Sequence, residues 1–347
     1  MDDLKFIQDI TESVEGASLG KEEQVNGYID SGSYALNYVI TGDMFKGYPK
    51  GRVVELFGDP STGKSLCIYT AIAEFQRQGG VVILDDTEYA FSEPFGKLLG
   101  VDCSSLIVLH SETVEEHFEK IFLEYFEEGL KKEDDGEEEP SKKEDKKKNK
   151  KRKAPIVDRL LERFGNGKIM VCLDSVAQLS TRHELDVKFE KSDMTKAKKI
   201  RTGIRLIVKK LSSNDITYLI SNHTIANIGN MYDDKTTPGG KAIPFQCAVR
   251  LELNVGKKIF DSDDQPIGVL SRVYCKKNKV SIPFRTCGIQ VEFDKGLNRL
   301  FDWLDLLVNL GIVAQGGAWY TWGDKKFQSK NFAEICPEIL ASLQIKT

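Results

Sequence analysis

The sequence predicts an α/β fold in which a mostly parallel, twisted sheet is flanked by helices. The first reason is a series of short apolar runs of strand length, separated by segments whose apolar residues recur at helical spacing. The second is a glycine-rich loop, residues 58–65, that stands between an apolar run and a helix-forming segment. The third is that the runs ending at residues 85–88 and at Asp174 finish in carboxylates, as strands do where they open toward a ligand crevice.

The size and charge of the chain limit its class. Its 347 residues are enough for one large core domain with smaller appendages. With 49 basic and 53 acidic residues the formal charge is −4, so nucleic acid would have to bind a local surface rather than the whole protein. The sequence shows no signal-peptide pattern and no apolar run near the ~18 residues of a membrane span, so we expect a soluble, intracellular, cytoplasmic protein.

The seven cysteines indicate a reducing compartment. They include no C-x-x-C pair, and most of them lie inside apolar runs. This pattern favours free buried thiols over disulfides or a zinc site.

We expect three regions along the chain. Residues 1–27 combine a short amphipathic helix with a polar tether, and because so short a helix is marginal alone, we expect it to dock on a neighbouring subunit. Residues 28–294 form the α/β core, and residues 295–347 form a small α+β appendage with two helices and a hairpin. Residues 127–153 are charged runs without apolar anchors, which predicts a disordered surface insertion. Its basic half either touches DNA or is a solvated loop, and composition favours the loop.

Within the core, each element has its own signal. Strands are expected at residues 53–57, 80–88, 106–109, 168–175, 216–221, 249–254, 269–275 and 289–293. Helices are expected from residues 66–73, from 114–125 after a capping box at Thr113 and Glu116, and at 195–211. Residues 181–193 are predicted to be a polar surface loop, and residues 226–241 a long glycine-rich loop of the kind that is usually functional.

The glycine-rich loop has the G-x-x-x-x-G-K-S pattern, which predicts binding of ATP. Its two glycines let the backbone wrap a phosphate, and successive N–H groups at the start of a helix hold the anion. Lys64 would reach the β- and γ-phosphates, and the Ser65 hydroxyl would bind Mg²⁺. A chance match is disfavoured because strand and helix flank the loop as required. The predicted nucleotide-binding residues are Gly58, Asp59, Pro60, Ser61, Thr62, Gly63, Lys64, Ser65 and Leu66.

Asp174 is the second expected Mg²⁺ ligand. It ends an apolar strand, as the acidic residue of a Walker B strand does, and would hold the ion opposite Ser65. Alone this pattern is weak, because many buried strands end in aspartate. Its position downstream of the phosphate loop favours the metal role.

Together these features resemble the RecA family of DNA recombinases over about residues 28–330, outside the charged insertion. The matching segments are Glu88-Tyr89-Ala90 to Leu99-Gly100-Val101-Asp102, Thr237-Pro238-Gly239-Gly240-Lys241-Ala242, Lys277-Asn278-Lys279 and Gly317-Ala318-Trp319-Tyr320. Residues 192–198 and 222–224 are most similar to phage UvsX-like recombinases. The resemblance implies a RecA-like P-loop NTPase core, a short N-terminal polymerisation helix, and ATP and Mg²⁺ as cofactors.

The resemblance also implies catalytic roles beyond Lys64. Glu88 would orient the attacking water, with structural capping as the weaker alternative. His223 stands where bacterial members have a glutamine that senses the γ-phosphate, although read alone it would be a core histidine. Lys277 and Lys279 match lysines that reach a neighbouring subunit's ATP, and without the resemblance they would be ordinary surface lysines.

The same resemblance implies that loops at about 180–194 and 224–244 hold single-stranded DNA. The predicted DNA-binding residues are Arg182, Lys188, Lys191 and Lys235 for phosphates, backbone N–H groups of Gly229, Gly239 and Gly240, and Ile228, Met231 or Tyr232 as a wedge between bases. The sequence leaves open which residue wedges. Composition alone would favour a mobile loop without a DNA role.

The sequence therefore predicts an ATP-dependent homologous recombinase that self-associates into a helical filament on single-stranded DNA and pairs it with homologous duplex DNA. Single-strand-binding and loader proteins are further candidate partners, and the source would be a bacterial or phage-infected cell. Two alternatives stay open, a RecA-fold helicase and an ATP-dependent scaffold that coats single strands without exchange. The chain departs from the family in its charged insertion, in the centre of its phosphate loop and in its short C-terminal region.

Overall fold

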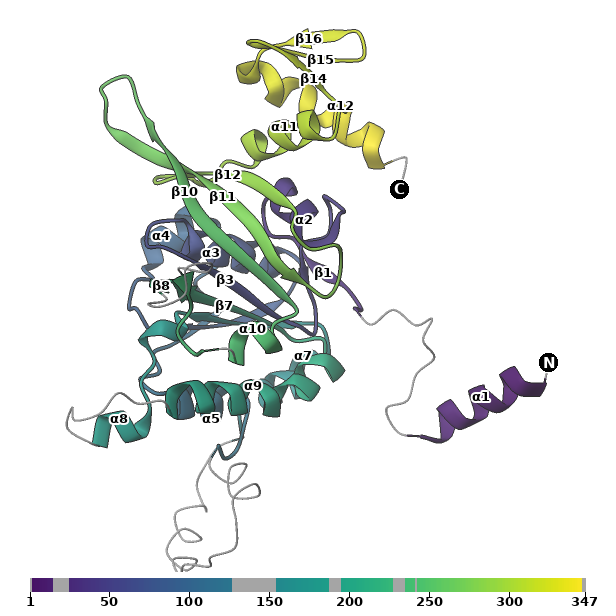
Figure 1. The fold of residues 1–347 in the computed structure, drawn as a ribbon, viewed down its shortest axis with the longest axis vertical. Coiled ribbons are helices and arrows are strands. Elements are labelled where there is room, and N and C mark those ends of the chain that lie inside the picture. Colours follow the sequence, from purple (N-terminus) through teal and green to yellow (C-terminus); the bar gives the residue numbers. More distant parts are fainter. Residues whose placement is uncertain are drawn as a thin grey trace, which may run out of the picture.

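The computed structural model describes residues 2–14, 25–126, 154–186, 195–226, 235–240 and 242–344. Within these residues the centre of the fold is a nine-stranded sheet (Figure 1). Its strands are β3 (Val53–Gly58), β4 (Val81–Asp86), β5 (Leu106–Leu109), β6 (Ile169–Asp174), β7 (Thr217–His223), β10 (Val249–Phe260), β11 (Pro266–Asn278), β12 (Thr286–Glu292) and β13 (Gly296–Leu297).

The sheet is mostly parallel, as predicted. The strand order is β13-β12-β11-β10-β3-β7-β6-β4-β5. The pairs from β10 through β3, β7, β6 and β4 to β5 are parallel. The pairs from β10 to β13 are antiparallel. Because parallel strands place their carboxyl ends at one edge, the ends of β3, β4, β6 and β7 meet there.

Helices cover both faces of the sheet (Figure 1). One face carries α2 (Tyr34–Thr41), α3 (Lys64–Arg77) and α4 (Glu93–Leu98), and the other carries α5 (Val114–Ile121), α7 (Ile156–Phe164), α9 (Thr195–Ser213) and α10 (Ala242–Gln246). Alternate side chains of β3 point to opposite faces of the sheet, since Val54 and Leu56 belong to one buried cluster and Val53 belongs to the other. The helix α7 was not anticipated from the sequence.

The start of α5 confirms the N-cap half of the predicted capping box, whereas the Glu116 carboxylate bonds the N–H of Glu112 and not that of Thr113. The Thr113 hydroxyl accepts a hydrogen bond from Glu116 N at 3.1 Å, and the Glu116 carboxylate accepts one from Glu112 N at 2.8 Å. The prediction of a surface loop over residues 181–193 was wrong at its start, where residues 182–186 form the short helix α8 (Arg182–Asp186). There the Thr181 hydroxyl accepts a hydrogen bond from Glu184 N at 3.1 Å, which stabilises a first helical turn.

The hairpin of β10 and β11 extends beyond the strands predicted from the sequence, and its outer part projects from the sheet (Figure 1). In this outer part Lys257 pairs with Leu270 and Ile259 with Gly268. Residues 255–258 of β10 are exposed, so this part of the strand lacks the buried apolar run from which strands were predicted, whereas Gly268 and Leu270 of β11 also pair with β12.

The C-terminal region is a small α+β unit built on α11 (Arg299–Asn309) and α12 (Phe332–Gln344). The predicted hairpin is part of a three-stranded sheet of β14 (Ala314–Gly316), β15 (Trp319–Trp322) and β16 (Lys325–Phe327). Its buried cluster includes Trp303 and Phe332, together with Ala35 of α2. The unit therefore shares apolar core with the main domain.

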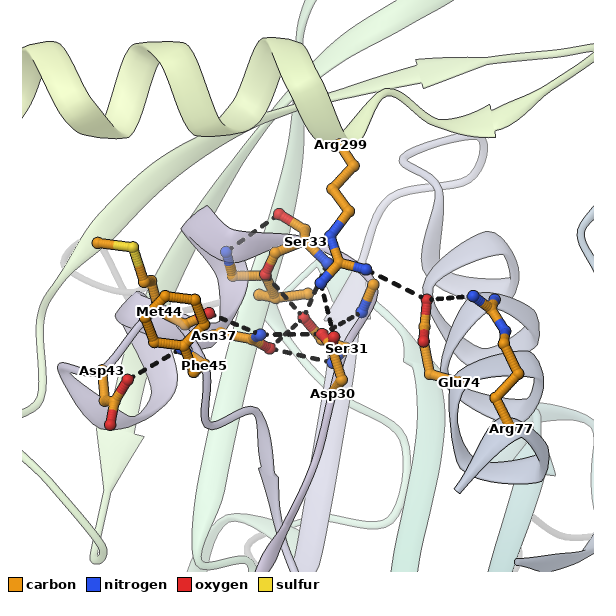
Figure 2. Close-up of polar contacts among 12 residues, drawn as sticks. Asp30, Ser31, Ser33, Asn37, Asp43, Met44, Phe45, Glu74, Arg77 and Arg299 are labelled. Atoms are coloured by element: carbon orange, nitrogen blue, oxygen red, sulfur yellow. Dashed lines mark hydrogen bonds and ion pairs between the residues drawn. The ribbon is translucent and has the colours of Figure 1, made fainter. Parts of the chain in front are cut away.

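Arg299 adds a polar link between this unit and the core (Figure 2). Its guanidinium lies 2.6 Å from Asp30 Oδ2 and 3.4 Å from Glu74 Oε1, and it also lies over the Tyr34 ring. Figure 2 shows the guanidinium between Asp30 and Glu74, which itself pairs with Arg77. Arg299 thus connects α11 to the segment before α2 and to α3.

The remaining elements are short. They are α1 (Asp2–Ser13), β1 (Tyr28–Ile29), β2 (Tyr48–Pro49), β8 (Ile225–Ala226), β9 (Lys235–Thr236) and the 3-10 turns Val176–Gln178 and Ser329–Asn331. The predicted N-terminal helix is present as α1, which stands apart from the sheet and exposes Phe6 and Ile10 (Figure 1). Its docking partner stays a prediction, and the charged insertion at 127–153 lies outside the described residues.

All seven cysteines are free, as predicted, and Cys103 and Cys287 are only partly buried. In the described part of the chain, no helix combines the length and apolar character needed to cross a membrane.

Candidate nucleotide-hydrolysis site

The phosphate loop joins β3 to α3 and depends on its two glycines. At Gly58, φ is 155° and a Cβ would lie 2.1 Å from the Leu253 carbonyl oxygen of β10. At Gly63, φ is 90° and the residue caps α3, which begins at Lys64. Because only glycine tolerates both the close approach and the left-handed backbone, the loop folds tightly against the helix start, where N–H groups face an anion.

Lys64 is held inside this loop. Its Nζ donates to the carbonyl oxygens of Gly58 at 3.1 Å and of Asp59 at 2.8 Å. Burial lowers the pKa of Lys64, and the charges of Asp174 and Glu88 partly oppose this effect. The ammonium group therefore occupies a position from which it can exchange main-chain carbonyls for phosphate oxygens.

A cavity of about 330 Å³ opens in front of the loop. It is lined by Pro60, Ser61, Thr62, Gly63, Lys64, Ser65, Leu66, Glu88, Phe95, Asp174, His223, Val269, Val291 and Phe293. The structure thus brings most of the predicted nucleotide and catalytic residues together. Gly58 and Asp59 are not among the lining residues, and the apolar side chains of α4, β11 and β12 were not anticipated.

Asp174 and Ser65 fit a hard divalent cation such as Mg²⁺. Asp174 is 2% exposed, and its Oδ1 accepts a hydrogen bond from the Ser221 hydroxyl. Its Oδ2 is buried and has no hydrogen-bond partner among the residues that the structure describes. Burial raises the pKa of this carboxyl above its ordinary value, and the hydrogen bond from Ser221 opposes the shift only in part. A buried carboxylate oxygen with room for a ligand, beside a hydroxyl, is the donor set that Mg²⁺ prefers.

Glu88 follows β4 and is positioned by the neighbouring strand β6. Asp86 pairs with Asp174 across the two strands, and Thr87 N donates to Asp174 O at 2.8 Å. The Asp86 carboxylate accepts hydrogen bonds from Ala90 N and Phe91 N, which turns the chain after Glu88. These backbone contacts explain why Glu88 and Asp174 face the same cavity.

Two donors hold the Glu88 carboxylate. Its Oε1 lies 2.5 Å from the Ser175 hydroxyl and 2.8 Å from His223 Nε2. Burial raises the pKa of Glu88, but the hydrogen bonds from Ser175 and His223 and the charge of Lys64 bring it below its ordinary value. The ionised carboxylate can orient a water and accept its proton. Sequence reasoning missed Ser175, although it directly follows the Asp174 strand end.

Lys277 and Lys279 lie far along the sheet from this cavity. Val249 of β10 pairs with Val54, at the amino end of β3, and with Asn278 of β11. The phosphate loop is at the other end of β3. Lys277 Nζ donates to the carbonyl oxygens of Pro244 and Phe245, at 2.6 and 2.9 Å. The structure therefore does not bring these two lysines to the phosphate loop of their own chain.

The predicted DNA-binding residues are only partly described. Arg182 of α8 pairs with Glu119, with one N–O distance of 3.1 Å. Gly239 and Gly240 have φ values of 93° and 60° in a turn after β9, which begins at Lys235. Lys188, Lys191, Ile228, Gly229, Met231 and Tyr232 lie outside the described residues.

Comparison with known proteins gives consistent results. A family model described as the RecA N-terminal domain matches residues 11–124 and 149–298. The chain is 31% identical over 327 residues to the protein RecA of Ruminococcus albus, covering 92% of this chain and 71% of that protein. It is 30% identical over 317 residues to the protein RecA of Phytoplasma mali, covering 88% and 80%. It is also 32% identical over 300 residues to the protein RecA of Chlorobaculum tepidum, covering 86% and 75%.

Proposed function

The chain belongs to the RecA family, and from this premise we propose that it is an ATP-dependent homologous recombinase. It forms a filament on single-stranded DNA, pairs that strand with a homologous duplex and exchanges strands. The observation that carries the proposal is the Glu88–His223 contact. It joins a general-base candidate beside the phosphate loop to the strand β7, which leads directly into the expected DNA loop.

The residues of the cavity have separate roles in ATP hydrolysis. Lys64 and the N–H groups at the start of α3 hold the phosphates. Ser65 and Asp174 would hold Mg²⁺, which would neutralise negative charge on the phosphate oxygens. Glu88 orients the attacking water and accepts its proton, and His223 and Ser175 hold the Glu88 carboxylate in place. Phe95, which lines the cavity, supplies an aromatic side chain for contact with the nucleotide.

In a filament, further positively charged groups reach the ATP from the neighbouring subunit. Because Lys277 and Lys279 lie at the opposite end of the sheet from the phosphate loop, they are suited to act on a neighbouring subunit's ATP. The exposed apolar face of α1 docks on another subunit in the same assembly. ATP then lies between subunits, so its binding favours the filament and its hydrolysis releases it.

DNA binding involves the segments after α8 and after β7. Lys188, Lys191 and Lys235 contact phosphates, the N–H groups of Gly229, Gly239 and Gly240 approach the backbone, and Ile228, Met231 or Tyr232 separates bases. Arg182 joins them only if DNA competes with Glu119 for its guanidinium. Within the family, Asn222-His223-Thr224 supports a place among UvsX-like recombinases. The protein then acts in the cytoplasm of a bacterium or phage-infected cell, with single-strand-binding and loader proteins as further partners.

Joint-molecule formation tests this function. The protein is mixed with a labelled single strand and a supercoiled homologous duplex at fixed salt, because phosphate contacts make affinity salt-dependent. We expect a paired product that requires ATP, Mg²⁺ and homology. Tight strand binding without pairing, even with accessory proteins, would instead indicate a scaffold, and directional unwinding of a forked duplex would indicate a helicase.

A further inference from the structure

The two described ends of the expected DNA loop after β7 are held by different groups, and only one of them is held by the phosphate loop. The described parts of this segment are residues 224–226 and 235–240, which we call the ribbon. Within it Ile225 pairs with Thr236 and Ala226 with Lys235, as the antiparallel strands β8 and β9. The ribbon therefore has two roots, one at Thr224 and one at residues 237–238.

The first root is attached to the phosphate loop itself. The Thr224 hydroxyl donates a hydrogen bond to Asp59 Oδ1. Asp59 does not line the nucleotide cavity, and its Oδ1 accepts the hydrogen bond from the ribbon. The main-chain oxygen of the same residue accepts a hydrogen bond from Lys64 Nζ at 2.8 Å. One loop residue thus contacts both the phosphate-binding lysine and the ribbon.

The second root is fixed by buried groups outside the phosphate loop. Asn222 Nδ2 donates to Pro238 O and to Glu55 Oε1, both at 3.0 Å. Glu55 is fully buried in β3 and forms an ion pair with Arg250. An Arg250 nitrogen lies 3.4 Å from the Thr237 hydroxyl. Because breaking a buried ion pair is costly, this root acts as a fixed anchor.

Lys64 links the phosphate site to the first root, through the main-chain carbonyl oxygen of Asp59. To bind a phosphate, Lys64 has to turn from the carbonyl oxygens of Gly58 and Asp59 to the phosphate oxygens. The incoming negative charge then repels a carboxylate that turns toward it. The bond to Thr224 keeps the Asp59 carboxylate directed at the ribbon, away from that charge.

We propose that Thr224 is a positioning residue that links nucleotide binding to DNA binding through Asp59. The inference rests on the proposed function, because it assumes that the ribbon belongs to the DNA-binding surface. The hydrogen bond between Thr224 and Asp59 favours ATP binding, and bound ATP in turn favours this hydrogen bond. By linkage, DNA that binds the ordered ribbon then gains affinity from ATP by the same factor that ATP gains from DNA.

The test is the ratio of single-stranded DNA affinities with and without a non-hydrolysable ATP analogue, measured at fixed salt. Thr224→Val is expected to reduce this ratio about fivefold or more. Thr224→Ser keeps the hydroxyl and should keep the ratio. The matched control is Thr286→Val, at an exposed threonine of β12, which should leave the ratio unchanged. A purely structural role of Thr224 would weaken DNA binding equally in both conditions.

A double-mutant cycle tests the route through Asp59. If Thr224 acts through Asp59, adding Thr224→Val to Asp59→Ala causes no further loss in the ratio. Additive losses would overturn the inference, as would a ratio that is large in the wild type and unchanged by Thr224→Val. If the DNA affinity of the wild-type protein is the same with and without the ATP analogue, the proposed function is overturned, and this inference with it.

Discussion

Two carboxylate–histidine pairs have their carboxylate in β4 or just after it, and the two pairs differ in how fully their hydrogen bonds are satisfied. Asp85 and His117 are both completely buried, with Oδ2 and Nδ1 2.7 Å apart. His117 Nε2 lies 2.8 Å from the Tyr218 hydroxyl, and Asp85 Oδ1 accepts a hydrogen bond from Ser111 N at 2.8 Å. Every polar atom of this pair has a protein partner, so the pair joins α5 to β4 and β7.

The second pair, Glu88 and His223, opens onto the nucleotide cavity. Its side chains are 25% and 27% exposed, and the adjacent Asp174 has a buried oxygen without a partner. In both pairs burial raises the pKa of the carboxyl but hydrogen bonds bring it below its ordinary value. Residue type and the direction of the pKa shift therefore do not distinguish a structural pair from a catalytic one. The two pairs are distinguished by access to a cavity and by a neighbouring carboxylate oxygen that lacks a hydrogen-bond partner.

The largest effect is expected from Glu88→Gln. An amide keeps the shape of the side chain but cannot accept the proton of the attacking water, so ATP turnover should fall about 10²- to 10⁴-fold. ATP binding and thermal stability should change little. The measurement is steady-state hydrolysis together with nucleotide affinity, and Glu93→Gln, at an exposed glutamate of α4, is the control. Normal ATP turnover by Glu88→Gln would show that Glu88 is not catalytic, and the two pairs would then not differ in function.

The buried pair should show the opposite profile. His117→Leu leaves the Asp85 carboxylate buried without its main donor, which should cost about 3–5 kcal/mol of unfolding free energy. Nucleotide affinity of the folded fraction should be nearly unchanged. The measurement is chemical denaturation, with His183→Leu at an exposed histidine of α8 as the control.

If His117→Leu does not fold, Tyr218→Phe provides a milder test. It removes only the hydroxyl near His117 Nε2 and should cost about 1 kcal/mol. A loss of ATP turnover without a loss of stability, in either variant, would place this pair in the catalytic machinery.

The sequence predicted the sheet and the phosphate site for a physical reason. Buried parallel strands are continuous apolar runs, and Glu88 and Asp174 follow such runs directly, so their common edge could be predicted. The pair of Asp85 and His117 could not be predicted, because their contact depends on how α5 packs on the sheet. The Thr224–Asp59 contact is equally hidden, since the two residues are separated by 165 positions and no pattern joins them.

Asp302 tests whether an unsatisfied buried carboxylate is enough to mark a site. Within the described part of the chain its Oδ2 has no hydrogen-bond partner, like that of Asp174, but Asp302 belongs to α11 and does not line the nucleotide cavity. Burial raises its pKa from 3.8 to about 8. We therefore expect a neutral carboxyl at pH 7 rather than a cation ligand.

This difference predicts a pH dependence of stability. Between about pH 4 and pH 8 the unfolded chain releases the Asp302 proton while the folded chain keeps it, so stability falls as pH rises through this range. The slope from this group is at most about 1.4 kcal/mol per pH unit. Asp302→Asn should remove that slope, and Asp294→Asn, at an exposed aspartate that does not contribute to the Asp302 shift, should not. Identical pH profiles for wild type and Asp302→Asn would contradict the assignment.

The smallest expected effect is a change in stability that distinguishes Asp174 from the structural carboxylates Asp85 and Asp302. Asp174→Asn keeps an acceptor for the Ser221 hydroxyl but removes a buried charge that lacks a second partner, so the free chain should gain about 1 kcal/mol of stability. With Mg²⁺ and ATP the order should reverse, because ligand binding to the folded state stabilises the wild type more. Thermal melting with and without Mg²⁺–ATP measures both effects, with Asp294→Asn as an exposed control. If Asp174→Asn destabilises the free chain and leaves the shift with Mg²⁺–ATP intact, Asp174 is a structural carboxylate like Asp85, and cavity access together with an unsatisfied oxygen does not identify a metal ligand.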